Sequence, residues 1–465
     1  MQKNRTLKIA IVPTRRGISS NRKGAFTVED ALRVKTEVFQ YLEKTKPANV
    51  EYVTIDFLND EGIMYDEAHA QIAAEFLKQQ QIDGIFILHC NFGCEEAVGR
   101  LCAILRKPVF LWGPRDAAIA SDGSRSTDTQ CGLFASSRLL RRHGVAFTYA
   151  ENCLLGNPAM VKQYEVFLGA VRTAKALSCM RIGQVCARPK YFTSVMINES
   201  ALIEQLGIEV IPINLAVIEE KMNQIAAESE RLQAECAQLC SRMECSATHK
   251  TTLDNSVLLK MALREIAEQY QLDGLAIECW TIMPQTIQAL PCLAIGELSD
   301  EGIPCCCETD IYGVIGSLLL QAAGNYQQPP FFGEYTMRDN EDDNKELIWH
   351  CGNAPYSLRA ETAKPAFVGG REAFSLKSGE ITVVRFDCDH GQFCLFADEA
   401  EAIDGAFTAG TYFWAKMKNW PAWERHFVYG PYIHHVSCAY GHYKEMLREC
   451  CKYVPAIHFD CVDTY

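Results

Sequence analysis

Short runs rich in β-branched residues alternate with amphipathic stretches over the first 112 residues, and this alternation constrains the fold more than any other feature. The first run, residues 6–13, precedes an apolar periodicity that predicts a helix over 28–46. The alternation continues through strands expected at 50–57, 83–89 and 108–112 and helices expected at 67–80 and 95–105. Such a series is typical of a doubly wound parallel sheet, which binds ligands outside the carboxyl ends of its strands.

The strand-first pattern begins again near residue 175, where we place a domain boundary. Further strands are expected at 180–186, 208–213 and 273–280, and one long helix is expected over 215–243. After about residue 349 the segments are short and β-rich, and 443–452 is the only helix expected there. The sequence therefore predicts an α/β fold: two doubly wound parallel-sheet domains, 1–175 and 176–350, followed by a β-rich, antiparallel, barrel-like domain, 351–465.

Three apolar segments in the second half of the chain each end on a side chain that can bind a metal ion. These side chains are Glu308 after a Cys-rich run, Glu334 after an aromatic run and His350 after a Trp-containing run. Far downstream, a Gly-Pro turn precedes two adjacent imidazoles, His434 and His435. Two carboxylates combined with imidazoles suit an Mn²⁺-like ion.

Glu308 also has a simpler interpretation. It precedes an amphipathic helix, so it could be a capping or first-turn acid, with Thr309 and Asp310 competing for the same position. The acidic stretch 339–343 lacks the glycine and the closing glutamate of a calcium-binding EF-hand loop, so we interpret it as a solvated loop.

Three motifs together resemble those of the L-fucose isomerase and L-arabinose isomerase superfamily. They are CETDIYG around Glu308, the acid-rich stretch from Glu334 to WHCGN, and the late HHV around His435. The resemblance is densest over 300–355 and 428–441, and it rests on the order and spacing of the motifs. The superfamily consists of metal-dependent aldose–ketose isomerases with two α/β domains and a β-rich one. The resemblance thus implies proton transfer between C1 and C2 of an open-chain sugar through a cis-enediol.

The resemblance also implies roles for individual residues. Glu308 and Glu334 match the paired acids that bind the metal and act as general acid and base, although many fucose isomerase-like members carry Asp at the second position. His435 is our first candidate for the imidazole ligand and His434 the second, since adjacent strand residues point to opposite sides. His350 remains open as a further ligand or a hydrogen-bond partner of substrate. The implied cofactor is Mn²⁺, or another divalent cation such as Mg²⁺ or Co²⁺.

The substrate is the least constrained part of the prediction. L-fucose, D-arabinose and L-arabinose are candidates, and so is a sugar with an anion at C6, such as sulfoquinovose. The N-terminal loops favour the anionic sugar, because a guanidinium can bind a sulfonate with two hydrogen bonds. The arginines in these loops are Arg15, Arg16, Arg22, Arg115 and Arg125. Our predicted substrate contacts are His350, Asn353, Arg15, Arg16, Arg115 and Trp280.

Composition limits the classes of binding partner and the cellular compartment that we expect for this protein. The net charge of −13 over 465 residues argues against nucleic acid or an anionic membrane as partner. The 22 cysteines lack paired metal-binding spacing, so we interpret most of them as small buried hydrophobic residues in a reducing cytoplasm. We expect a cytoplasmic enzyme that acts on a small monosaccharide. The resemblance adds a homo-oligomer, trimer or hexamer, whose active site a neighbouring subunit's N-terminal domain completes.

Two other functions stay open from the sequence. A non-catalytic sugar-binding protein also has two α/β domains beside a crevice, and a metal-dependent aldolase uses a similar ion. Bound metal would argue against the first, and a product with an unchanged number of carbon atoms would argue against the second.

Overall fold

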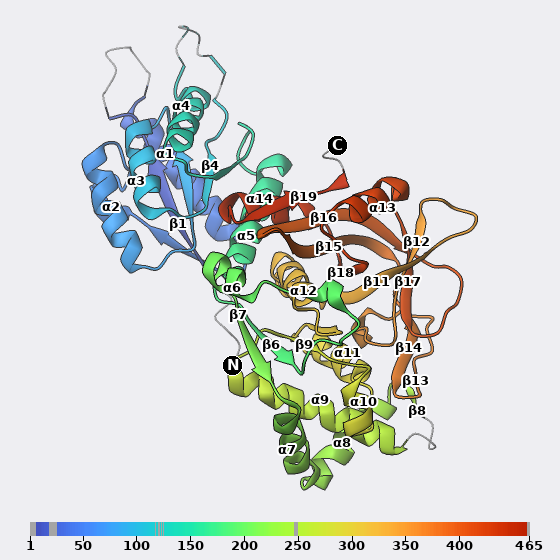
Figure 1. Cartoon of the computed structure of the whole chain (residues 1–465). Coiled ribbons are helices and arrows are strands. Elements are labelled where there is room, and N and C mark those ends of the chain that lie inside the picture. Colours follow the sequence, from blue (N-terminus) through green and yellow to red (C-terminus); the bar gives the residue numbers. More distant parts are fainter. Residues whose placement is uncertain are drawn as a thin grey trace. The chain divides into compact units, whose positions relative to one another are not determined.

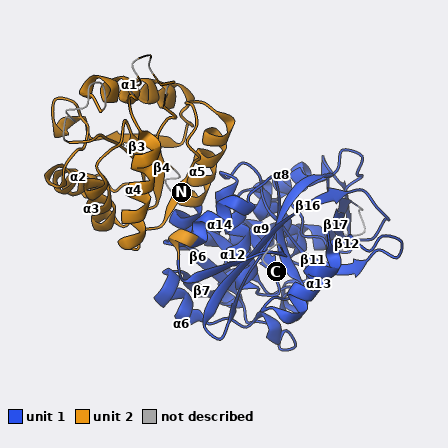
Figure 2. Ribbon diagram, turned by 90° about the horizontal axis from the view of Figure 1, so that it is seen from above, with its two compact units in different colours: residues 1, 173–451, 455–465 blue, residues 2–172, 452–454 orange. Residues whose placement is uncertain are grey.

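The structure, a computed structural model, describes residues 6–17, 26–116, 118, 119, 121, 123, 125–245 and 250–462. The chain divides into two compact units, which Figure 2 colours separately. The N-terminal unit comprises Gln2–Arg172 together with Lys452–Val454, and the larger unit comprises Met1, Thr173–Cys451 and Pro455–Tyr465.

A five-stranded parallel sheet with the order β2-β1-β3-β4-β5 forms the N-terminal unit (Figure 1). Its strands are β1 (Leu7–Thr14), β2 (Val50–Thr54), β3 (Gly84–His89), β4 (Val109–Trp112) and β5 (Phe147–Tyr149). Its helices are α1 (Val28–Thr45), α2 (Glu67–Gln79), α3 (Glu95–Leu105), α4 (Thr129–Arg142) and α5 (Pro158–Leu177). The predicted doubly wound parallel sheet is confirmed, with its change of winding direction between β1 and β3.

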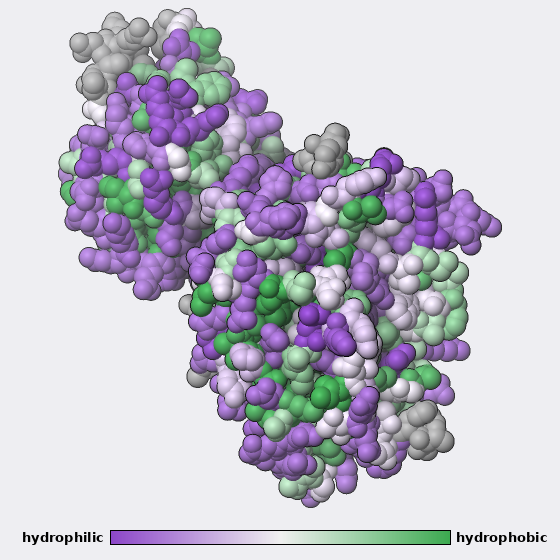
Figure 3. Space-filling view, viewed as in Figure 1, coloured by the Kyte–Doolittle hydropathy of each residue, from purple (hydrophilic) through white to green (hydrophobic). Residues whose placement is uncertain are grey.

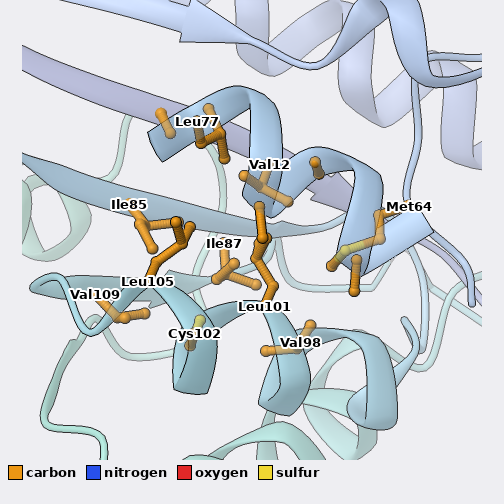
Figure 4. Close-up of a cluster of buried hydrophobic side chains, with 14 of the residues drawn as sticks. Val12, Met64, Leu77, Ile85, Ile87, Val98, Leu101, Cys102, Leu105 and Val109 are labelled. Carbon is orange, nitrogen blue, oxygen red and sulfur yellow. The ribbon is translucent and has the colours of Figure 1, made fainter. Parts of the chain in front are cut away.

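Helices cover both faces of this sheet. Ala10 and Val12 of β1 join a buried cluster with α2 and α3, whereas Leu7, Ile9 and Ile11 join one with α1 and α5, as the two-residue period of a strand requires. Figure 4 shows the first cluster, where side chains of the strands meet those of α2 and α3. The carboxyl ends of the strands, rather than the faces of the sheet, are therefore left to present polar side chains.

A second parallel sheet, of four strands in the order β10-β9-β6-β7, begins the larger unit. Its strands are β6 (Arg181–Val185), β7 (Glu209–Ile213), β9 (Gly274–Ile277) and β10 (Cys305–Cys307). The accompanying helices are α6 (Glu199–Ala201), α7 (Leu215–Ala226), α8 (Ser229–Cys240), α9 (Lys250–Tyr270), α10 (Ile282–Ile287), α11 (Cys292–Asp300) and α12 (Ile311–Ala323).

Six antiparallel strands then close into a barrel, in the order β16-β15-β18-β11-β12-β17 and back to β16. They are β11 (Phe331–Arg338), β12 (Lys345–His350), β15 (Gly379–Asp389), β16 (Gln392–Ile403), β17 (Thr411–Lys416) and β18 (His435–Tyr440). The flanking elements are β8 (Glu244–Cys245), β13 (Ala366–Val368), β14 (Arg371–Ser375), β19 (Ile457–Asp460), α13 (Trp420–Tyr429) and α14 (Lys444–Tyr453). The predicted barrel-like C-terminal region is confirmed, and closure pairs the edges of these six strands.

Helix α12 joins the parallel sheet to the barrel. Every one of its residues is buried, because one side contacts β9 and β10 and another contacts β15 and β18. Ser317 on this helix and Ser437 on β18 are linked by a hydrogen bond of 2.7 Å between their hydroxyl oxygens. Ser437 also donates to the Gly313 carbonyl at 3.2 Å, so the first turn of α12 is held next to the start of β18.

Three expectations about individual elements were wrong. The helix expected over 215–243 is two helices, α7 and α8, because each packs against α9 and the chain bends at Ala227 and Glu228 without a Gly or Pro. Helix α13 was not expected, because 443–452 was the only helix predicted after residue 349, although Asn419 caps α13 by accepting from the Ala422 amide. The strand carrying Glu334 does not end there but continues to Arg338.

The three-domain division stays a prediction. Strands β11 and β12 lie within the range 176–350, which we assigned to the central domain, yet they pair with strands of the barrel. Glu334 therefore lies on a barrel strand, whereas Glu308 follows a strand of the parallel sheet.

The surface is mostly hydrophilic on the face shown in Figure 3. None of the helices in the described ranges is both long and apolar enough to cross a membrane.

One buried acid of the barrel predicts a pH-dependent stability. Glu346 on β12 is only 3% exposed, and one of its carboxylate oxygens has no hydrogen-bond partner among the described residues. Burial raises the pKa of Glu346 to about 8, and Glu424 adds to the shift. When folding raises the pKa of a carboxyl, the folded state loses stability as the pH increases from the ordinary pKa toward the raised pKa.

We expect the free energy of unfolding of Glu346→Gln, relative to that of the wild-type protein, to increase by about 1–3 kcal/mol when the pH is raised from 5 to 8. Urea unfolding at both pH values measures this change. The exposed Glu380→Gln on β15 is the matched control, and an equal pH response in both variants would contradict the prediction.

Candidate metal centre and active site

A strained turn presents Glu308 at the end of β10. Glu308 and Thr309 both have left-handed backbone conformations, with φ of 63° and 57°, which are unfavourable for non-glycine residues and most of all for β-branched Thr. The turn is tied to β9 by a hydrogen bond of 3.2 Å from the Thr309 amide to the Ile277 carbonyl. Asp310, not Glu308, caps α12, since its carboxylate accepts from the Gly313 amide at 2.9 Å. The side chain of Glu308 is thus free of a capping role.

Glu334 and His435 are direct cross-strand neighbours in the antiparallel pair of β11 and β18. Directly opposed residues in such a pair project their side chains to the same face. His434 precedes β18, so strand alternation does not govern its side chain, and both imidazoles reach the same place. Our expectation that the two rings would point to opposite sides was therefore wrong.

The two acids and the two imidazoles converge. His435 Nε2 lies 3.0 Å from Glu308 Oε2, and His434 Nε2 lies 3.4 Å from Glu334 Oε2. One ligand atom each from Glu334, His434 and His435 lies within 4.8 Å of the others. That set omits Glu308, but the 3.0 Å contact with His435 brings this acid to the same centre.

The donor atoms suit a divalent cation. Glu308 Oε2 and His435 Nε2 are buried and, despite their separation of 3.0 Å, neither has a partner with hydrogen-bond geometry among the described residues. The other ring nitrogen of His435, Nδ1, is hydrogen-bonded to Asp310 at 2.9 Å. Unpartnered carboxylate and imidazole donors around one point are the ligands that such an ion requires. The described residues thus include a site that could hold a metal ion.

The surroundings shift the pKa values of the two acids in opposite directions. Burial alone would raise the pKa of both, but contact with His435 outweighs it and lowers the pKa of Glu308. For Glu334, burial dominates and the charge of Glu308 adds to it, so the pKa of Glu334 is raised. Burial opposes the charge on His435 as well, yet Asp310 and Glu308 raise the pKa of its ring to about 9.

Asp310 belongs to a buried chain of charges behind His435. Its Oδ2 oxygen accepts from both His435 Nδ1 and Arg385 Nη1, and Arg385 is also paired with Asp387 at 2.8 Å. Desolvation works against the carboxylate, but Arg385 and His435 hold the pKa of Asp310 well below its usual range.

His350 and Asn353 lie beside the centre. The rings of His350 and His435 are 6.4 Å apart, and burial, with His435 adding, lowers the pKa of His350 to about 3. His350 Nδ1 accepts from the Cys351 amide at 2.9 Å, while Nε2 is unpartnered within the described ranges. Asn353 uses its amide nitrogen to bond the Phe332 carbonyl at 3.1 Å, so it holds the aromatic run in place.

Aromatic side chains surround the two imidazoles. Phe192 stacks on His435 with ring centroids 5.5 Å apart and an interplanar angle of 16°, and it also contacts His434 at 5.8 Å. Trp280, which we predicted to touch substrate, is 44% exposed and meets Phe192 at 6.5 Å. Phe332 contacts His435 edge-on at 5.1 Å.

The predicted arginines lie in the N-terminal unit, where they differ in availability. The guanidinium of Arg15 is buried in a two-pronged pair with Glu61, at 2.5 and 2.9 Å, and it lies over the Tyr65 ring. Arg16 is half-buried and stacks on Phe92 at 4.6 Å. Arg115 is exposed and donates to the Asn152 carbonyl.

The remaining loop arginines are weaker candidates for binding the substrate. Arg125 is paired with Asp128, and Arg22 lies outside the described residues. At the last residues of β3 and β4 and in the loop after β3, three buried polar atoms have no partner among the described residues: His89 Nε2, Asn91 Nδ2 and Trp112 Nε1.

Sequence reasoning missed three residues of the site. Asp310 was considered only as a helix cap, Arg385 was not considered, and Phe192 carried no signal in the sequence. Arg385 did leave a signal, because a charge inside the apolar run 383–386 of a buried strand requires a partner.

Known proteins with similar sequences are sugar isomerases, which agrees with a metal-binding arrangement of acids and imidazoles. Residues 17–178 match the family described as fucose/sulfoquinovose isomerase, N-terminal domain. The sulfoquinovose isomerases of Priestia aryabhattai and Priestia megaterium are each 25% identical over 345 residues, which are 70% of this chain and 74% of theirs. The sulfoquinovose isomerase of Alkalicoccus urumqiensis is 25% identical over 64% of this chain and 67% of its own.

The chain resembles the fucose isomerase-like superfamily. These similarities indicate an aldose–ketose isomerase, as the sequence predicted. The match to a fucose/sulfoquinovose isomerase domain favours that branch, although Glu334 stands where many of its members carry Asp.

The two histidines should differ in their contribution to metal binding. His435 is fully buried and held by Asp310, whereas the side chain of His434 is 42% exposed. We expect His435→Gln to raise the Kd for Mn²⁺ by at least about 100-fold and His434→Gln by less than about tenfold. Titration calorimetry on both variants, after circular dichroism has shown that they fold, measures the difference. Equal losses would mean that both rings are ligands.

Proposed function

We propose that this protein is a metal-dependent isomerase that converts a C6-anionic aldose, sulfoquinovose in the first instance, to the corresponding ketose. The observation that carries the proposal is the convergence of Glu308 from the turn after β10, Glu334 from β11 and His435 from β18. Each of these side chains offers a donor atom suited to a divalent cation.

Glu308, Glu334 and His435 would hold the ion, with His434 as a fourth candidate. We propose Mn²⁺, with Mg²⁺ or Co²⁺ as substitutes. A divalent cation supplies Lewis-acid polarisation of the sugar carbonyl and its neighbouring hydroxyl when it is bound.

The two glutamates would move the protons. A carboxylate removes the hydrogen on C2 of the open-chain aldose as a proton, and the electron pair left behind forms the C1–C2 double bond of a cis-enediol as O1 gains a proton. The same carboxylate returns the proton to C1, while the proton on O2 is removed and the C2 carbonyl forms. Atoms and electrons balance without an external oxidant, and Glu308 after β10 and Glu334 on β11 can serve two different oxygens or carbons.

His350 would orient the substrate. Its Nδ1 accepts a hydrogen bond from a backbone amide, so the neutral ring carries its proton on Nε2, which has no partner among the described residues. That N–H can donate to a sugar hydroxyl. Phe192 and the half-exposed Trp280 offer apolar surface to the carbon-bound hydrogens of the ring or chain.

The choice of an anionic substrate rests on the relatives and on one arginine. The curated relatives are named for sulfoquinovose, whose sulfonate needs a cationic partner. Among the predicted arginines, Arg16 is the best candidate for binding the sulfonate, because the guanidinium of Arg15 is already paired with Glu61. Neutral L-fucose or arabinose is the second candidate, since the matched N-terminal family includes fucose isomerases.

We further propose a cytoplasmic homo-oligomer, trimer or hexamer, as the family resemblance implies. Light scattering during size-exclusion chromatography measures the mass of the assembly.

We expect Glu308→Gln to lower kcat/KM by at least about 10³-fold, because it removes both a metal ligand and a proton acceptor. Conversion of sulfoquinovose to its ketose, followed by NMR with Mn²⁺ and again with a chelator, measures this loss. The wild-type protein should lose activity with the chelator and regain it with added Mn²⁺.

The control is Glu341→Gln, which changes an exposed acid in the 339–343 loop. A fully active Glu308→Gln would contradict the proposed mechanism, and a product with fewer carbon atoms would indicate an aldolase instead. Metal and sugar binding without turnover would indicate a sugar-binding protein.

The sulfonate contact is tested separately with Arg16→Ala. Loss of a charge-assisted hydrogen-bond pair should raise KM for sulfoquinovose by about 10–100-fold while leaving KM for a neutral aldose within about twofold. Arg33→Ala, which removes an exposed arginine paired with Glu37 on α1, is the matched control. Equal kinetics for Arg16→Ala and the wild type on sulfoquinovose would remove Arg16 from the proposal.

A further inference from the structure

We propose that Asp310 is the positioning residue of the metal centre: it fixes the orientation and the tautomer of His435, so that Nε2 presents its lone pair to the ion. This inference rests on the proposed function. It adds a role for a residue that touches neither the ion nor the sugar.

The hydrogen-bond geometry of Asp310 determines where the proton of His435 lies. Its Oδ1 oxygen accepts from the Gly313 amide at 2.9 Å, and its Oδ2 oxygen lies 2.9 Å from His435 Nδ1. An ionised carboxylate can only accept, so Nδ1 must be the protonated nitrogen in this contact. The lone pair of a neutral His435 is then on Nε2, which lies 3.0 Å from Glu308.

Arg385 keeps Asp310 in the state that this role needs. Arg385 is 1% exposed, and it lies between Asp310 and Asp387. A guanidinium does not give up its proton in proteins, so it holds the neighbouring carboxylates as acceptors. Its Nε donates to Asp387 at 2.9 Å, which aligns the guanidinium toward Asp310.

Packing restricts the ring that Asp310 orients. Phe192 stacks on one face of His435 at 5.5 Å, and Phe332 meets the ring edge-on at 5.1 Å. The ring therefore has little freedom to rotate, and the Asp310 contact selects between its two tautomers. A carboxylate behind a metal-bound imidazole in this way typically contributes 10–100-fold to metal affinity.

Asp310→Asn is the decisive variant, because asparagine keeps the shape and is itself a favourable helix cap. Its single carbonyl oxygen cannot accept from Gly313, His435 and Arg385 together, as the carboxylate does. We expect the Kd for Mn²⁺ to rise by about 10–100-fold at fixed pH, with circular dichroism unchanged.

Asp398→Asn is the matched control, since Asp398 is a buried carboxylate of the barrel that pairs with Lys444 rather than with Arg385 or His435. It should change the Kd by less than about threefold. If the wild-type protein itself binds no Mn²⁺, the proposed function fails. If the wild type binds Mn²⁺ and Asp310→Asn binds it within about twofold as tightly, the present inference alone is overturned.

A second measurement needs no substitution at Asp310. In the Zn²⁺-loaded wild-type protein labelled with ¹⁵N-histidine, we expect the His435 signal, identified by its loss in His435→Gln, to show a proton on Nδ1. A His435 ring that is protonated on Nε2 in this sample would overturn the proposal, even if Asp310→Asn fails to fold.

Discussion

Burial of helix α12 between the parallel sheet and the barrel is the constraint on which the site depends. The helix is buried at every residue, with β9 and β10 on one side and β15 and β18 on another. Close-packed interiors allow little relative displacement of such elements. The residues just before the helix, Glu308 and Asp310, are therefore held against the start of β18, where His435 lies. Donor positions fixed by regular elements are more accurate than positions on mobile loops.

This arrangement concentrates ionisable groups where burial is expensive. Asp310, Arg385 and His435 are each almost fully buried, and their mutual contacts compensate part of the desolvation cost. The left-handed backbone at Glu308 and Thr309 adds conformational strain at the same place. A chain selected only for stability would fill this volume with apolar side chains. Local disagreement with the rules of stable folding is expected where a site has a chemical task.

Sequence periodicity was sufficient for most of the fold but not for the contacts of the site. The strand and helix alternation of the N-terminal unit followed from the apolar pattern, because each element buries a regular face. Barrel membership of β11 did not follow, since pairing with β18 depends on residues far apart in the chain. Glu308, Glu334 and His435 were found through motifs, whereas the contact of Asp310 with His435 needed three-dimensional information. The same holds for Arg15, whose pairing with Glu61 no local pattern reveals.

The pairing of β11 with β18 also sets an order of events during biosynthesis. Glu334 and His435 are opposed in the barrel, yet most of the barrel sequence separates them along the chain. Proteins emerge from the ribosome N-terminus first, so both glutamates are exposed to the cell well before the imidazole is made. A nascent or C-terminally truncated chain thus carries only the carboxylate half of the donor set. Capture of a cation by the proposed full set would therefore be a late step, after β18 has closed the barrel.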